Sequence, residues 1–199
     1  MLVLLRHGQA SANAAGLLLG RTDAPLTETG RRQAATLAPL LGAVTRLVSS
    51  PLVRARDSAA ALGLDLEIEV DDRWIEIDYG TLEGAPLGSV PGEEWRRWRA
   101  DPTHRPAGGE TLVEVGTRVR AACEDLFATE GAGARDPAGD VVVVSHVSPI
   151  KAAVAWALGA GDALSWRLHL STGSLTRIGW AADGPVLHTY NALPVPPVL

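Results

Sequence analysis

Residues 2–8 read Leu-Val-Leu-Leu-Arg-His-Gly, a short apolar run that ends abruptly at Arg6, His7 and Gly8. Four aliphatic residues followed by a charge and a glycine are typical of a buried strand with polar residues at its carboxyl end. In open α/β sheets, ligands bind just outside the carboxyl ends of the strands. An arginine fork suits a phosphate oxygen, and an imidazole is a candidate nucleophile. On its own, such a tripeptide is best interpreted as a strand end that happens to be polar, and a phosphate site is favoured only because the pattern recurs.

The same pattern recurs twice further along the chain. Residues 141–144 are four valines that lead into Ser145 and His146, and residues 45–48 lead into a helix that carries Arg54. If the three strands are parallel neighbours, two guanidinium groups and two imidazoles meet at one edge of the sheet. Such a set suits a dianionic phosphoryl group, whose transfer depends mostly on positioning and charge stabilisation.

The whole chain shows an alternation of strand and helix patterns. Strands are expected at 2–6, 45–49, 66–70, 140–145, 173–180 and 185–190, and helices at 30–42, 52–63, 93–100, 110–129 and 149–159. Alternation of this kind predicts an α/β fold, a three-layer α/β/α sandwich around a central, mostly parallel sheet. With 199 residues, 46% of them hydrophobic, residues 1–199 are expected to form one domain. The irregular segment 79–106 is expected to form a small cap over the site.

Composition excludes several classes of protein. The formal net charge of −5 argues against a general nucleic-acid surface, which would be basic. No apolar stretch approaches the roughly 20 residues of a membrane span, and no signal peptide is evident. Cys123 is the only cysteine, so an internal disulfide is excluded and a cytoplasmic location is expected.

Other catalytic motifs are missing from the sequence. A P-loop needs Gly-Lys-Ser/Thr, but the only lysine, Lys151, follows Ile150. There is no His-Glu-x-x-His zinc motif and no Gly-x-Ser-x-Gly nucleophile elbow. Neither a metal nor a cofactor is expected.

Segments spread over nearly the full length resemble, in order, the motifs of the histidine phosphatase superfamily, also called phosphoglycerate mutase-like. They are 6–9 with Asn13, 20–30, 50–55, 75–84, 108–111 and 145–146. The chain is most similar to small α-ribazole phosphatase-like proteins, and residues 145–151 also resemble the phosphatase half of fused ribonuclease H–phosphatase proteins. The resemblance implies a phosphomonoester hydrolase that acts on a small phosphorylated metabolite through a phosphohistidine.

The resemblance also implies roles for individual residues. His7 would be the nucleophile, and His146 a second catalytic imidazole that hydrogen-bonds the phosphoryl oxygens. Arg6, Asn13 and Arg54 would bind phosphate. A nucleophilic imidazole must be neutral with one nitrogen free, so the other nitrogen should donate to a fixed acceptor.

Three carboxylates compete for the role of proton donor, namely Glu76, Asp78 and Glu83. Such a donor would protonate the departing oxygen and then activate water. Spacing alone does not rank the three. The resemblance selects Glu76, assigns Glu83 to orienting a loop, and leaves Asp78 solvated.

The substrate contacts are less sharply specified. The resemblance places Gly20 and Arg21 in a substrate loop, while Val147 would narrow the pocket and Ser148 could add a donor. Two alternatives to a hydrolase stay open: a cofactor-dependent phosphoglycerate mutase, and a phospholigand-binding protein without catalysis. A homodimer is also left open.

Overall fold

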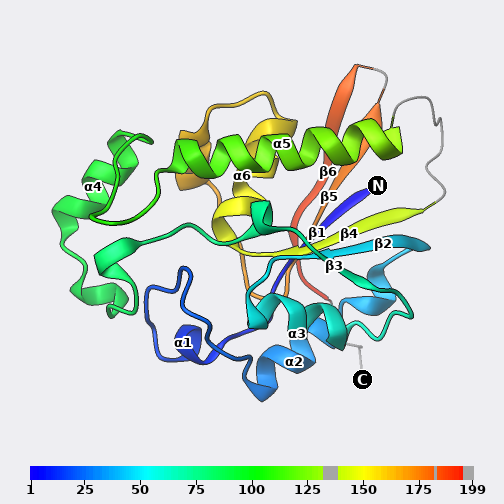
Figure 1. The fold of residues 1–199 in the computed structure, drawn as a ribbon, viewed down its shortest axis with the longest axis horizontal. Helices are drawn as coiled ribbons and strands as arrows, with labels where there is room; N and C mark the ends of the chain where they lie inside the picture. The colour runs from blue at the N-terminus through cyan, green and yellow to red at the C-terminus, as the bar shows by residue number, and fades with distance from the viewer. Residues whose placement is uncertain (132–138, 182, 195–199) are drawn as a thin grey trace.

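A six-stranded sheet forms the centre of the computed structural model, which describes residues 1–131, 139–181 and 183–194 (Figure 1). Its strands are β1 (Leu2–Arg6), β2 (Val44–Ser49), β3 (Ile68–Val70), β4 (Asp140–Ser145), β5 (Leu175–Ala181) and β6 (Gly184–Ala192). In the order β3-β2-β4-β1-β5-β6, the first four are mutually parallel, and β5 and β6 are antiparallel additions. The prediction of a mostly parallel sheet is confirmed.

Helices cover both faces of this sheet. The α-helices are α1 (Ser11–Ala14), α2 (Glu28–Ala35), α3 (Val53–Ala61), α4 (Gly92–Ala100), α5 (Leu112–Gly131) and α6 (Val147–Ala157). Short 3₁₀ helices are η1 (Ala38–Leu40), η2 (Asp72–Trp74), η3 (Gly80–Leu82), η4 (Leu87–Ser89) and η5 (Asp162–Arg167). Helices α5 and α6 lie on one face, and α2 and α3 lie on the other (Figure 1). The three-layer α/β/α architecture is therefore confirmed.

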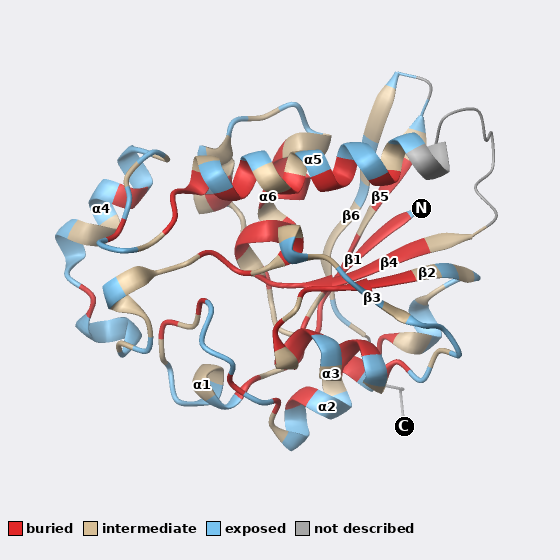
Figure 2. Cartoon of the chain, viewed as in Figure 1, coloured by how far each residue is buried: buried red, intermediate tan, exposed pale blue. Residues whose placement is uncertain are grey.

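The core explains why the first strand is apolar at four positions in a row. Leu2 and Leu4 pack into the layer under α5 and α6, whereas Val3 and Leu5 pack against α3 on the opposite face. All four side chains are buried, and Figure 2 shows the central strands as the most continuously buried part of the chain. Burial of one such side chain is worth about 1.5–3 kcal/mol.

One predicted helix is shorter than its pattern suggested. The helix expected at 30–42 begins earlier, at Glu28, because the side chain of Thr27 accepts a hydrogen bond from the Gly30 amide at 3.0 Å. It ends at Ala35 instead of continuing to residue 42. Pro39 has no amide hydrogen and disfavours helical geometry in the residue before it, so the chain tightens into η1.

Segment 79–106 packs around its own aromatic side chains and Trp166 of η5. It contains η3, η4 and α4, and the buried ring of Trp98 contacts Tyr79, Trp95 and Trp166. In Figure 1, α4 lies on the opposite side of the molecule from the amino-terminal start of β1. Among the described helices, none combines the length and apolar character that a membrane crossing requires.

Candidate active site

The carboxyl ends of the parallel strands bring four basic side chains together. Arg6 ends β1 and pairs in register with Ser145 of β4, which directly precedes His146. Arg54 lies in the first turn of α3, just after β2. The rings of His7 and His146 have centroids 5.0 Å apart. Residues that are far apart in the sequence thus surround one point.

His7 is held in a single tautomer. Its imidazole is buried, and Nδ1 lies 2.6 Å from the carbonyl oxygen of Gly8. A carbonyl only accepts, so Nδ1 carries the proton and Nε2 keeps its lone pair. Burial holds the pKa of His7 well below its usual value, and the charges of Arg6 and Arg54 lower it further. The ring is therefore neutral at physiological pH, with the lone pair of Nε2 available.

A close backbone contact fixes the carbonyl that orients His7. A Cβ on Gly8 would lie 2.0 Å from the Gly30 oxygen in α2. The two backbone segments are therefore in direct contact, with no side chain between them. The Gly8 amide also donates to Ser58 Oγ at 3.1 Å, and that hydroxyl donates to the Arg54 carbonyl at 2.7 Å. The Gly8 peptide is therefore held in place by Gly30 on α2 and by Ser58 on α3, and its carbonyl stays in position to accept from His7.

His146 has one nitrogen satisfied and one free. Its Nε2 lies 2.7 Å from Ser50 Oγ, while Nδ1 is buried and has no partner within the described part of the chain. Ser50 Oγ also accepts a long hydrogen bond from the Leu52 amide. If the serine hydroxyl donates to Nε2, Nδ1 carries a proton that a ligand can accept. Burial lowers the pKa of His146, with Arg54 and His7 adding to the effect.

The two arginines are partly used by the protein itself. Arg6 donates through Nη1 to the Leu170 carbonyl at 2.6 Å, and Arg54 donates to the carbonyls of Thr22 and Gly20 at 2.8 and 2.5 Å. The Nε–H group of each is buried and has no partner among the described residues. A buried donor without a partner costs about 1–3 kcal/mol, which a bound anion would recover.

Glu76 lies at the amino terminus of α6. Its carboxylate accepts hydrogen bonds from the amides of Ile77, Val147 and Ser148, at 2.9, 3.0 and 3.0 Å. Val147 and Ser148 are the first two residues of α6, whose amides have no partner within the helix and need an acceptor. Together they fix this buried side chain in one orientation beside the cavity described below.

The other two candidate acids have different surroundings. Glu83 accepts hydrogen bonds from the amides of Gly20 and Thr22 at 2.8 and 2.9 Å, so it orients that loop as expected. The expectation that Asp78 is simply solvated is wrong. It is half-buried, accepts from the Gly80 amide at 2.7 Å and lies 3.6 Å from Arg21. Its position just before η3 makes it a turn cap, because an aspartate readily accepts a hydrogen bond from an amide two residues on.

A cavity of about 140 Å³ lies beside these groups. Its walls are Arg6, His7, Asn13, Leu17, Leu18, Leu19, Glu76, Tyr79, Leu87 and Val147. Asn13 accepts a hydrogen bond from the Ala10 amide at 3.0 Å through its oxygen, which leaves its amide nitrogen for a ligand. Arg54 and His146 are buried next to His7 and are not among these walls. Nothing in the sequence pattern marked the four leucines as part of the site.

Gly20 and Arg21 do not line this cavity, although the sequence placed them in a substrate loop. A Cβ on Gly20 would lie 2.4 Å from Glu83 Oε2, so this glycine allows close packing. Arg21 turns toward Glu110, with its Nη2 3.1 Å from Oε2 of that carboxylate. Its Nε donates to the Glu76 carbonyl at 3.4 Å. The structure therefore gives these two residues packing and bracing contacts.

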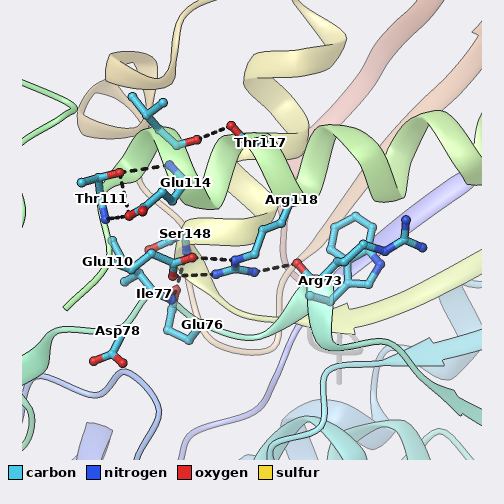
Figure 3. A network of polar contacts seen from close by, with 12 residues as sticks. Arg73, Glu76, Ile77, Asp78, Glu110, Thr111, Glu114, Thr117, Arg118 and Ser148 are labelled. Atoms are coloured by element: carbon cyan, nitrogen blue, oxygen red, sulfur yellow. Dashed lines mark hydrogen bonds and ion pairs between the residues drawn. The ribbon is translucent and has the colours of Figure 1, made fainter. Parts of the chain in front are cut away.

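Glu110 binds two arginines, Arg21 and Arg118, which in turn hold the backbone on either side of the Glu76 segment. Arg118 donates twice to Glu110, at 2.9 and 3.1 Å, and once to the Arg73 carbonyl at 2.6 Å (Figure 3). Since Arg21 holds the Glu76 carbonyl, the segment carrying the candidate acid is fixed at both ends. The sequence pattern marked only the motif at 108–111 and missed Arg118, whose contact with the Arg73 carbonyl joins residues 45 apart in the sequence. Within the described residues, no group of three or more His, Cys, Asp or Glu side chains could hold a metal ion.

This geometry predicts the protonation state of both histidines. At pH 6 the imidazoles of His7 and His146 are expected to be neutral, because burial and two neighbouring guanidinium groups disfavour the charged form. Both should carry the proton on Nδ1. Nitrogen chemical shifts of the imidazoles report charge and tautomer directly, and the exposed His169 provides a reference signal. An Nε2–H tautomer at His7 would contradict the prediction that this residue is the nucleophile.

Comparison with known proteins identifies relatives of the whole chain. A family model described as "Histidine phosphatase superfamily (branch 1)" matches residues 2–193. A bifunctional protein of Mycobacterium tuberculosis is 40% identical over 92% of this chain, which spans 51% of that relative's length. The glucosyl-3-phosphoglycerate phosphatase of the same organism is 36% identical, with 92% of both chains covered. A Yersinia pestis protein named a probable phosphoglycerate mutase is 32% identical, covering 94% of this chain and 90% of the relative.

A solved structure agrees with these sequence relatives. The mycobacterial glucosyl-3-phosphoglycerate phosphatase, solved in complex with VO3, has a TM-score of 0.86 and 35% identity to this chain. The comparison covers 96% of this chain and 98% of the other.

Proposed function

Because the chain belongs to the histidine phosphatase superfamily, we propose that it is a phosphomonoester hydrolase that works through a phosphohistidine intermediate. One observation carries the proposal. His7, whose Nδ1 is fixed on the Gly8 carbonyl, stands among three buried N–H groups without partners in the described residues. These are Nε of Arg6, Nε of Arg54 and, in the inferred tautomer, Nδ1 of His146. Together they offer a nucleophile and the donors that a phosphoryl group needs.

The first step transfers the phosphoryl group to the enzyme. The two arginines, Asn13 and His146 hold the phosphoryl oxygens, and the lone pair of His7 Nε2 attacks phosphorus. The bond from phosphorus to the alcohol oxygen breaks, and Glu76 gives its proton to that oxygen. The alcohol leaves, and a phosphorus–nitrogen bond remains on His7.

The second step returns the enzyme to its starting state. The Glu76 carboxylate takes a proton from water as the water oxygen attacks phosphorus. The phosphorus–nitrogen bond breaks, its electron pair returns to His7 Nε2, and inorganic phosphate leaves. Glu76 has regained the proton that the next cycle needs, so one residue serves as acid and then as base.

The competing function is a phosphoglycerate mutase, which must hold its phosphoenzyme away from water. Segment 79–106, proposed as a cap within a single domain, is short for a complete seal. We therefore expect incubation with 3-phosphoglycerate to release inorganic phosphate and to yield little 2-phosphoglycerate. A chelator should not change the rate, because arginines and histidines supply the charge stabilisation. The assay follows free phosphate and both isomers in parallel.

The outcomes of this assay separate the alternatives. Rapid interconversion of the two phosphoglycerates without phosphate release would favour the mutase. Loss of hydrolysis with chelator, restored by a divalent ion, would contradict the proposed charge stabilisation. Binding of phosphate without turnover of any phosphomonoester would favour a non-catalytic phospholigand-binding protein.

We propose a small phosphorylated metabolite as the substrate, as the resemblance and the modest cavity of about 140 Å³ suggest. The relatives of this chain include a glucosyl-3-phosphoglycerate phosphatase, which supports a phosphorylated small molecule as the substrate class. We also propose a cytoplasmic setting, because the single cysteine, Cys123, is buried as a free thiol. A homodimer is compatible with these features.

A further inference from the structure

A second, smaller cavity lies next to the first and shares two of its walls, Tyr79 and Val147. Its volume is about 60 Å³. Most of the remaining walls come from α4, α6 and η5, including Trp98, Lys151 and Trp166, and Ile77 and Leu112 complete them. Because the two cavities have common walls, a substrate whose phosphate lies against His7 can place its leaving group toward the second one.

Lys151 is the only charged residue in the walls of this second cavity. It is the only lysine of the chain and lies on α6, one turn after Val147. Across residues 1–131, 139–181 and 183–194 its ammonium group makes no hydrogen bond or ion pair. Burial lowers its pKa, an effect that Glu76 opposes and Arg6 reinforces. A partly buried cation without a partner is costly, and a bound anion would offset that cost.

The other polar walls add groups that can donate to an anion. Ser148 and Ser165 contribute hydroxyls, and the indole N–H of Trp166 is buried with no partner in the part of the chain described. No acidic side chain lines the cavity. A single water needs about 10–15 Å³ of such space, so 60 Å³ accommodates a group of a few heavy atoms. A carboxylate fits this size and this charge.

We propose that Lys151 binds a carboxylate on the leaving group of the substrate, so that the second cavity selects phosphomonoesters of hydroxy acids. This proposal rests on the proposed phosphomonoesterase function and adds the chemical class of its substrate. Lys151 is then a specificity residue, and it takes no part in the transfer of the phosphoryl group.

A pair of compounds tests the proposal by binding alone. The two differ in one group, since 3-phosphoglycerate has a carboxylate where glycerol 3-phosphate has a hydroxymethyl group. In the His7→Ala variant, which prevents turnover, we expect 3-phosphoglycerate to bind about 10–100-fold more tightly, as a charge-assisted hydrogen bond allows. Adding Lys151→Met should remove this preference and leave the Kd for glycerol 3-phosphate unchanged. Arg56→Met, which removes an exposed charge on α3, is the matched control and should change neither Kd.

Each result of this titration supports or overturns the proposal that Lys151 binds the carboxylate. Equal weakening of both compounds by Lys151→Met would overturn the proposal, because Lys151 would then act on the phosphate or on the fold. A preference for 3-phosphoglycerate that survives the substitution would overturn it as well. Phosphate release by the wild-type protein is measured separately. If the Lys151-dependent preference is present but no phosphomonoester is hydrolysed, the carboxylate site stands and the hydrolase function fails.

Discussion

Replacing His7 by alanine is expected to lower phosphate release from every substrate by at least about 10³-fold. The side chain supplies the atom that attacks phosphorus, and the loss of a covalent nucleophile removes the two-step route altogether. Phosphate should still bind, because Arg6, Arg54 and His146 remain in place. The measurement is kcat for a panel of phosphomonoesters, together with the affinity of the variant for inorganic phosphate.

A matched variant and a trapping experiment complete this test. His169→Ala removes an exposed histidine and should leave kcat unchanged. Brief reaction of the wild-type protein with a radiolabelled substrate should leave label on His7, in a form that survives alkali and is lost in acid. Label found on His146 would exchange the roles of the two histidines, and the tautomer arguments would then have to be reversed.

Replacing Glu76 by glutamine is expected to give losses that depend on the leaving group. General acid catalysis is worth about 10²–10⁴-fold, but only where the departing oxygen needs a proton. An alkyl phosphate should show that full loss, whereas a nitrophenyl phosphate leaves as a weak base and should form phosphohistidine nearly as well. Hydrolysis of the phosphohistidine should still be slow, because glutamine cannot take a proton from the attacking water. Rapid-mixing measurements should therefore show a burst of nitrophenol followed by slow turnover.

The contacts of Glu76 add a structural cost to this substitution. Its two oxygens accept three backbone amides, from Ile77, Val147 and Ser148. Glutamine has one oxygen and one NH₂ group, so at least one of these amides loses its acceptor, at a cost of about 1–3 kcal/mol. Thermal unfolding of the variant measures this cost independently. The burst with nitrophenyl phosphate shows in the same sample that the site is intact.

One outcome would exclude Glu76 as the acid. If the first chemical step slows equally for alkyl and nitrophenyl phosphates, the loss is structural, and the proton comes from another group. Asp78 and Glu83 would be tested next, although both already hold backbone amides of neighbouring turns.

The sheet could be predicted from the sequence because its central strands are buried on both faces. A strand buried on both faces needs an unbroken apolar run, such as Leu2–Leu5 or Val141–Val144. Short runs of this kind are typical of central parallel strands. Helix ends were harder to predict. The periodic pattern of residues 30–42 continues past Ala35, and Pro39, which ends it, is a single residue within that pattern.

The strand ends also marked which residues of the site come together, but not how each side chain is used. Arg6, His7 and His146 follow apolar runs, so parallel pairing brings them to one edge. Arg21 has the same charge as Arg6 and lies in a loop that resembles a substrate loop. Its contact with Glu110, 89 residues away, turns it from the cavity, and a long-range ion pair leaves no trace in local sequence.

The contact between Gly8 and Gly30 makes the position of the Gly8 carbonyl depend on which residue stands at position 30 of α2. Neither position has room for a methyl group, since a Cβ on Gly30 would lie 2.1 Å from the Gln9 oxygen. It would also lie 2.8 Å from the Gln9 nitrogen, which shares a peptide group with the Gly8 carbonyl, so a replacement at Gly30 would displace the carbonyl that holds His7 in its tautomer. In the course of evolution, the outward positions of α2 can therefore drift, while Gly30 is constrained by a reaction it never touches.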